Sequence, residues 1–113
     1  MNITLDNQAD QGFKVAISGD MDAIGCKEIK EVVDRIITMN FNGEITMDLE
    51  QVNFMDSSGI GAIVYLYKRL KEVDRVISLH NVSGQPLELM QLLRIDSAIA
   101  IHSKHANAYR DCL

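Results

Sequence analysis

The most constraining feature of this chain is a change of hydrophobic period near its middle. Apolar residues alternate at Ile45, Met47 and Leu49, which is the period of a half-buried strand. Beyond the segment 52–59 they recur at helical spacing, at Ile60, Ile63, Val64 and Tyr67. The pattern predicts a strand that leads through a short turn into a helix, and a chain built from such units folds as an α/β domain.

Two serines and an acid occupy this turn, in the order Asp56-Ser57-Ser58, and glycines follow at Gly59 and Gly61. Asp and Ser are common at such positions because they cap the free N–H groups of the first helical turn. One capping residue would suffice, however, and each glycine costs about 1 kcal/mol relative to Ala inside a helix. The segment is therefore either a helix cap alone or an exposed regulatory site. In the second case the small glycines would leave room for another protein, and Ser58 would be the key residue.

The α/β pattern continues along the rest of the chain. Alternating residues predict an antiparallel pair of strands at 3–5 and 13–17. An apolar stripe predicts a helix that Asp20 or Asp22 caps and that ends near Met39. Further strands are expected at 44–49, 76–79 and 99–101, and further helices from the serine turn to about 73, from about 86, and at 106–113. We therefore expect one α/β domain over residues 1–113, with a mostly parallel mixed sheet of about five strands and about four helices.

Charge and composition argue against several classes of partner. The chain has 16 acidic and 11 basic residues, a formal net charge of −5, and nucleic-acid phosphates would be repelled by it. We expect no membrane insertion, because no apolar run approaches the roughly 20 residues of a span and no signal-like leader is present. Cys26 and Cys112 make no disulfide framework and are expected to be free thiols in the cytoplasm.

The sequence does not support the common catalytic or metal-binding patterns. Ser57 and Ser58 lack the Gly-x-Ser-x-Gly context of a hydrolase nucleophile. His102 and His105 have a spacing that binds zinc on a helix, but they straddle a predicted strand end without a Cys or acid pair at ligand spacing. The stretch 59–61 lacks the Lys of a phosphate-binding loop. We therefore expect no enzyme activity, no metal and no cofactor.

The segment Phe54-Met55-Asp56-Ser57-Ser58-Gly59-Ile60-Gly61 resembles the signature of STAS domains, the family of bacterial anti-sigma-factor antagonists. Gly19-Asp20-Met21-Asp22 is similar to the family's turn before its first helix, and 87–95 and 99–101 resemble its third helix and last strand. After Asp22 the chain departs from the family pattern, because Ala23, Ile24, Gly25 and Cys26 stand where a Thr or Ser is common. A second departure replaces a frequent Gly pair with the residues 72–75. Neither departure touches the serine motif.

The resemblance implies a cytoplasmic partner-switching regulator. In antagonists of the family one serine of the motif is phosphorylated by a partner kinase that is also the anti-sigma factor, and position assigns this role to Ser58, with Ser57 as the runner-up. The chain would bind this ATP-binding serine kinase while Ser58 is free and be released on phosphorylation, and a metal-dependent serine phosphatase would reverse the change. Asp56 would either orient the serine hydroxyl in the kinase complex or serve only as a cap.

Two further expectations follow. The alternative function is an adaptor subunit of a transport or lipid-trafficking complex that works without phosphorylation. In either case the first turn of the serine helix and the turn at 20–25 should face the same partner, because both follow strands whose C-terminal ends lie near one another. The expected contact residues are Asp20, Asp22, Ile24, Asp56, Ser57, Ser58, Gly59 and Ile60.

Overall fold

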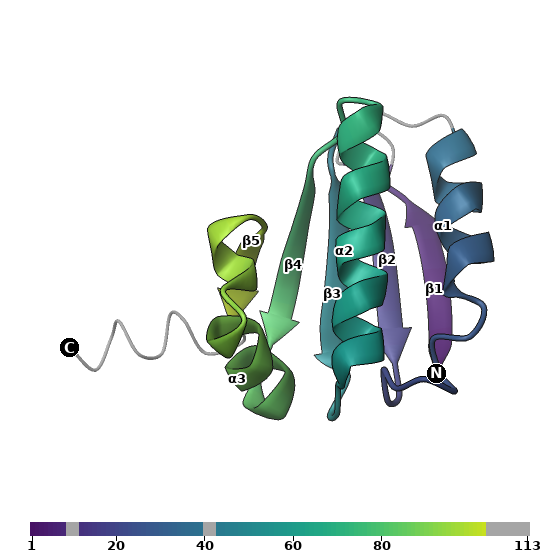
Figure 1. Cartoon of the computed structure of the whole chain (residues 1–113). Coiled ribbons are helices and arrows are strands. Elements are labelled where there is room, and N and C mark those ends of the chain that lie inside the picture. The colour runs from purple at the N-terminus through teal and green to yellow at the C-terminus, as the bar shows by residue number, and fades with distance from the viewer. Residues whose placement is uncertain (9–11, 40–42, 104–113) are drawn as a thin grey trace.

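A computed structural model of the chain describes residues 1–8, 12–39 and 43–103. These residues contain a five-stranded sheet in the order β1-β2-β3-β4-β5 (Figure 1). β1 runs antiparallel to β2, and every other neighbouring pair is parallel. The strands are β1 (Asn2–Asn7), β2 (Phe13–Ser18), β3 (Ile45–Gln51), β4 (Ile77–Val82) and β5 (Ala100–Ser103). The predicted mixed, mostly parallel sheet is confirmed.

In the described part of the chain, three α-helices and one short 3-10 helix lie between the strands. They are α1 (Ile29–Thr38), α2 (Ser57–Glu72), α3 (Gly84–Leu92) and the 3-10 helix η2 (Ile95–Ser97). Figure 1 shows α1 and α2 over one face of the sheet and α3 near the β4 and β5 edge. The helix predicted at 106–113 lies outside the described residues. The expected number of about four helices is consistent with this arrangement.

The first helix begins later than the sequence predicted. Residues 23–28 form turns, and α1 starts only at Ile29. The carboxylate of Asp22 accepts a hydrogen bond from the Gly25 N–H at 2.7 Å, so it closes a local turn instead of capping a long helix. Short acidic side chains favour such turns by offering the backbone an alternative to helical hydrogen bonds. The predicted cap at Asp20 or Asp22 was therefore wrong.

The apolar core lies between the sheet and the helices α1 and α2. Alternating strand residues point into it, among them Val15 and Ile17 on β2 and Met47 and Leu49 on β3, and each is at most 2% exposed. The helices contribute Val33, Ile36, Ala62, Ile63, Leu66 and Leu70. Met47, Met55 and Met90 are also buried, as unbranched apolar side chains that fill irregular gaps commonly are.

The buried stripe of α2 differs in part from the one expected. Ile63 is buried as predicted, but Ile60, Val64 and Tyr67 are only half-buried. Besides Ile63, the buried positions of the helix are Gly59, Ala62, Leu66 and Leu70. Gly59 and Ala62 are small and therefore weak hydrophobic signals in a sequence, whereas Leu66 and Leu70 continue the helical spacing of Ile63.

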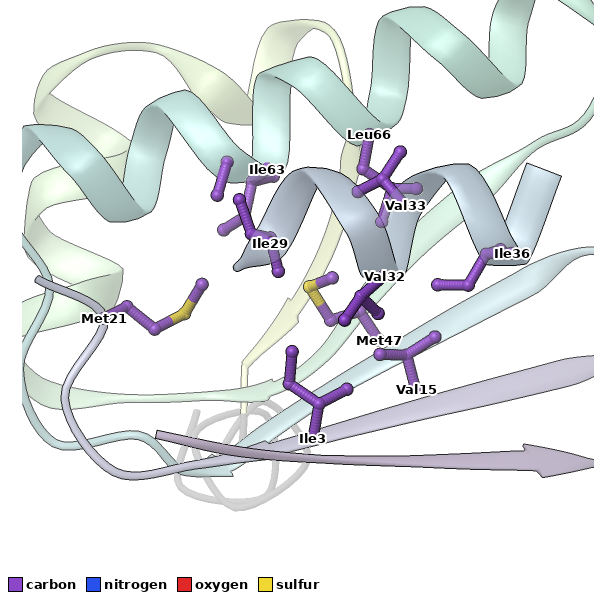
Figure 2. Close-up of a pocket in the computed structure, with 11 residues that line it drawn as sticks. Ile3, Val15, Met21, Ile29, Val32, Val33, Ile36, Met47, Ile63 and Leu66 are labelled. Carbon is purple, nitrogen blue, oxygen red and sulfur yellow. The ribbon is translucent and has the colours of Figure 1, made fainter. Parts of the chain in front are cut away.

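Figure 2 shows a small cavity between the sheet and the helices α1 and α2. Its volume is about 10 Å³, and every residue that lines it is apolar. This is about the space that one water needs, and a buried water also needs two to four polar partners. The cavity is therefore a packing gap and not a ligand site.

The other face of the sheet carries polar side chains. His80 on β4 hydrogen-bonds Ser78, with 2.9 Å between Nε2 and Oγ, and stacks on His102 of β5 with the ring centroids 4.5 Å apart. Burial, and then the charge of His102, lower the pKa of His80 below its ordinary value of 6.5. Glu44 and Asp48 oppose this shift, but they do not reverse its direction.

We expect this histidine to make the free energy of unfolding depend on pH. The unfolded chain binds a proton at His80 near pH 6.5, whereas the folded chain binds it only at lower pH, so stability should fall as the pH drops below about 6.5. His80→Gln should flatten this slope. Urea denaturation between about pH 7.5 and about pH 5 measures it. Identical slopes for the wild type and the variant would show that the folded imidazole binds protons normally.

Candidate functional site

The serine turn is the N-terminus of α2. Asp56 is the N-cap, and its Oδ1 accepts a hydrogen bond from the Ser58 N–H at 2.8 Å. Ser57 is the first helical residue and is exposed, while Ser58 is half-buried. The predicted strand-to-helix turn and its cap are therefore confirmed, and the cap is a single residue. The side chains of Ser57 and Ser58 are therefore not needed to cap the helix.

The turn after β2 and the turn after β3 are joined by backbone hydrogen bonds. The Met21 N–H donates to the Phe54 oxygen at 3.0 Å, and the Asp56 N–H donates to the Met21 oxygen at 3.3 Å. Met21 and Met55 thus form an isolated parallel bridge that continues the β2–β3 pairing past the strand ends. The predicted proximity of the 20–25 turn to the serine turn is confirmed.

Gly59 is buried where the first turn of α2 presses on the 20–22 turn. A Cβ atom built on Gly59 would lie 2.6 Å from the Met21 carbonyl oxygen and 2.6 Å from the Met55 Cγ. The space at Gly59 is therefore filled by the chain itself and not left for a partner. At Gly61, by contrast, a Cβ atom would meet no heavy atom of the described chain within 4 Å apart from its chain neighbours and the adjacent backbone of α2. Only Gly61 leaves the open space that the sequence suggested for both.

The side chain of Gln85 reaches the serine turn from α3. Its Oε1 accepts a hydrogen bond from the Met55 N–H at 2.8 Å, and its Nε2 donates to the Met55 oxygen at 2.7 Å. Sequence reasoning missed this residue, because a contact across 30 positions leaves no local pattern. Its place in the first turn of a helix that follows a parallel strand was the only available signal.

Exposed apolar side chains lie on both turns. Ile24 is 86% exposed, and Phe54 is 43% exposed. Ile24 was predicted to be a contact residue, whereas the exposure of Phe54 was not predicted. Val52 and Met55, which flank Phe54 at short distance in the sequence, are both buried. Apolar groups held out of the core beside polar residues are typical of protein interaction sites.

Cys26 is buried next to the two turns. Burial, and then the negative charges of Asp56 and Asp22, raise the pKa of its thiol. A buried, protonated thiol is a poor nucleophile and a poor metal ligand. Cys26 is a free cysteine, as expected, and Cys112 lies outside the described residues.

Among the residues that the structure describes, no group of three or more His, Cys, Asp or Glu side chains could hold a metal ion. His105, the second histidine of the zinc-like spacing, falls outside them. In the same part of the chain, no helix has the length and apolar character that crossing a membrane requires.

Comparison with known proteins identifies the family. The model of the STAS domain matches residues 4–108, so the chain belongs to the STAS domain family. An anti-sigma-B factor antagonist of Bacillus subtilis (strain 168) is 26% identical over 106 residues, which cover 92% of this chain and 94% of the relative. A protein of the same name from Staphylococcus aureus (strain NCTC 8325 / PS 47) is 28% identical over 95 residues, which cover 81% and 85%.

Solved structures share the fold. The anti-sigma factor antagonist SpoIIAA in its unphosphorylated form has a TM-score of 0.69 at 19% identity, with 97% of this chain and 96% of that chain covered. The phosphorylated form of SpoIIAA, a Bacillus cell fate determinant, gives 0.68 at 19% identity, with 96% and 98% covered. A sulfate transporter family protein from Wolinella succinogenes gives 0.68 at 15% identity, with 88% and 84% covered. The chain is thus a STAS-fold domain.

Proposed function

We propose that this chain is an anti-sigma-factor antagonist that is switched by phosphorylation of Ser58. The observation that carries the proposal is the position of Ser58 in the first turn of α2, beside a turn that displays Ile24. Relatives at 26–28% identity that are named anti-sigma-B factor antagonists support it. The chain would act in the cytoplasm as ligand and kinase substrate, with the enzymatic activities in its partners.

The partner surface would combine the two joined turns. Exposed Asp20 and half-buried Asp22 supply negative charge, and Ile24 and Phe54 supply apolar contact area. The surface would also include four residues at the start of α2, namely Asp56, Ser57, Ser58 and Ile60. Gly59 is buried and would contribute by allowing the first turn of α2 to pack closely on the 20–22 turn. Such a surface fits a partner with an apolar centre and basic residues at the rim, since complementary charge speeds association.

A phosphoryl group on Ser58 would oppose docking without unfolding the domain. It adds about −1.5 to −2 charges, which the free N–H groups and dipole of a helix N-terminus can accommodate. The capping carboxylate of Asp56 is already bound to the Ser58 N–H, however, so the added charge stands beside an existing one. A dry interface over both charges would be costly. Coupling of about 1–3 kcal/mol, or 5–150-fold in affinity, is the usual scale of such control.

Phosphosite mapping tests the choice of serine. We expect the native kinase and ATP to label Ser58, because the bond from its own N–H to Asp56 holds this residue in one orientation. Fragment mass spectra of the wild type, Ser57→Ala and Ser58→Ala locate the label. Label should persist in Ser57→Ala and vanish in Ser58→Ala. Modification confined to Ser57, the more exposed serine, would refute the assignment.

The second candidate is an adaptor that needs no phosphorylation. The STAS-like fold of the sulfate transporter family protein favours it, because this fold also occurs beside transport functions. Affinity capture from the native cell with wild-type and Ser58→Asp baits separates the two functions. A kinase that binds only the wild-type bait supports switching. Transport components recovered equally with both baits, with no phosphate on the chain, support the adaptor.

A further inference from the structure

The loop before Ser58 is fixed from two sides. On one side, the backbone of Met21 binds the Phe54 oxygen and the Asp56 N–H. On the other side, the carboxamide of Gln85 binds the N–H and the oxygen of Met55 at 2.8 and 2.7 Å. The paired donor and acceptor of Gln85 act as one residue of a neighbouring strand would act.

The burial of Met55 makes this contact important. Met55 is 0% exposed with Gln85 in place, and Gln85 itself is an exposed residue, so the carboxamide separates these backbone groups from water. A buried backbone group that loses its partner is costly, and the loop would shift to find another. Asp56 follows Met55 directly, and its carboxylate holds the Ser58 N–H at 2.8 Å. A shift of the Met55 backbone would therefore move Asp56, and with it the carboxylate that binds the Ser58 N–H.

We propose that Gln85 is a positioning residue for Ser58, which fixes the Met55 peptide and thereby the orientation in which the serine is presented to its kinase. The catalytic consequence rests on the proposed phosphorylation of Ser58. The structural consequence, a loop held by α3, does not depend on it. This arrangement also makes the first turn of α3 part of the regulatory site, although α3 lies 26 residues beyond the serine in the sequence.

The chemistry of the carboxamide provides a specific test. Glutamine offers one donor and one acceptor, and both are used. A glutamate of nearly the same shape offers two acceptors when ionised, so one of its oxygens faces the Met55 oxygen without a proton. Protonated glutamate regains the donor. A Gln85→Glu chain should therefore keep the bond from the Met55 N–H at every pH, lose the bond to the Met55 oxygen near neutral pH, and recover the latter below about pH 4.3.

Amide hydrogen exchange of the full chain measures the contact directly. In Gln85→Ala the Met55 amide should exchange about two- to tenfold faster than in the wild type, the range for one lost hydrogen bond. In Gln85→Glu the carboxylate still accepts the Met55 N–H, so any acceleration near neutral pH should be smaller than in Gln85→Ala and should disappear at low pH. Gln91→Ala, at an exposed position of the same helix, is the matched control and should match the wild type at each pH. Unchanged Met55 protection in Gln85→Ala would overturn the proposal.

The phosphorylation rate tests the positioning role. With ATP and a lysate of the native cell, we expect Ser58 to be labelled at least about threefold more slowly in Gln85→Ala than in the wild type or Gln91→Ala, in line with the lost hydrogen bond. Equal rates, despite faster Met55 exchange, would overturn the positioning role. Absence of label on the wild type would refute the proposed phosphorylation and this role with it, while the exchange result would still decide whether Gln85 holds the loop.

Discussion

Ser58→Asp is expected to weaken binding of the anti-sigma factor partner by about 5–150-fold, while Ser58→Ala binds at least as well as the wild type. The aspartate places a fixed charge beside the Asp56 carboxylate, in the surface that the partner would bury. Alanine leaves this surface neutral and small. Neither change removes the cap, because Asp56 binds the backbone N–H of residue 58 and not its side chain. The domain should therefore stay folded in both variants.

Calorimetric titration with the purified partner gives these affinities. Amide exchange in the complex should show added protection over 20–25 and 56–60 for the wild type and for Ser58→Ala. Ser97→Asp is the matched control, since it adds the same charge at an exposed serine outside this surface and should leave the affinity unchanged. Aspartate carries about one charge where phosphate carries nearly two, so the measured loss is a lower bound. Equal affinities of all forms would exclude electrostatic switching at this serine.

Gly59→Ala should reduce the free energy of unfolding by about 1–3 kcal/mol, the usual cost of overpacking. The added methyl group would lie 2.6 Å from the Met21 oxygen, which also accepts the Asp56 N–H. Either α2 or the 20–22 turn must then move. Helix propensity alone predicts the opposite sign, because alanine is favoured over glycine by about 1 kcal/mol within a helix.

Gly61→Ala is the matched control for this prediction. It makes the same substitution two residues further along α2, where the new atom would meet nothing in the described chain within 4 Å apart from its chain neighbours and the adjacent backbone of α2. It should therefore stabilise the domain by about 0.5–1 kcal/mol. Urea denaturation of both variants gives the two signs. If both substitutions stabilised the domain, α2 and the 20–22 turn could move apart without a loss of stability, and the prediction for Gly59 would be wrong.

Local patterns were enough to determine the order of elements and the place of the serines. The alternation at Ile45, Met47 and Leu49 and the helical spacing that follows are set within windows of a few residues. Asp56 could be recognised as a cap for the same reason. Most of the sheet, the α2 boundaries and the junction of the two turns could thus be predicted. The resemblance of the 54–61 segment to STAS domains then indicated the family, which the match over residues 4–108 shows.

The tertiary structure decided which residues hold the serine turn and which face outward. Gln85 binds Met55 across 30 positions, and Gly59 must be small because Met21 lies against it. Phe54 is left at the surface although it is as apolar as its buried neighbours. The delayed start of α1 likewise depended on a competing turn at Asp22. These features escaped prediction because their energies arise from contacts between distant segments, whereas a sequence pattern reports only the preferences of neighbouring residues.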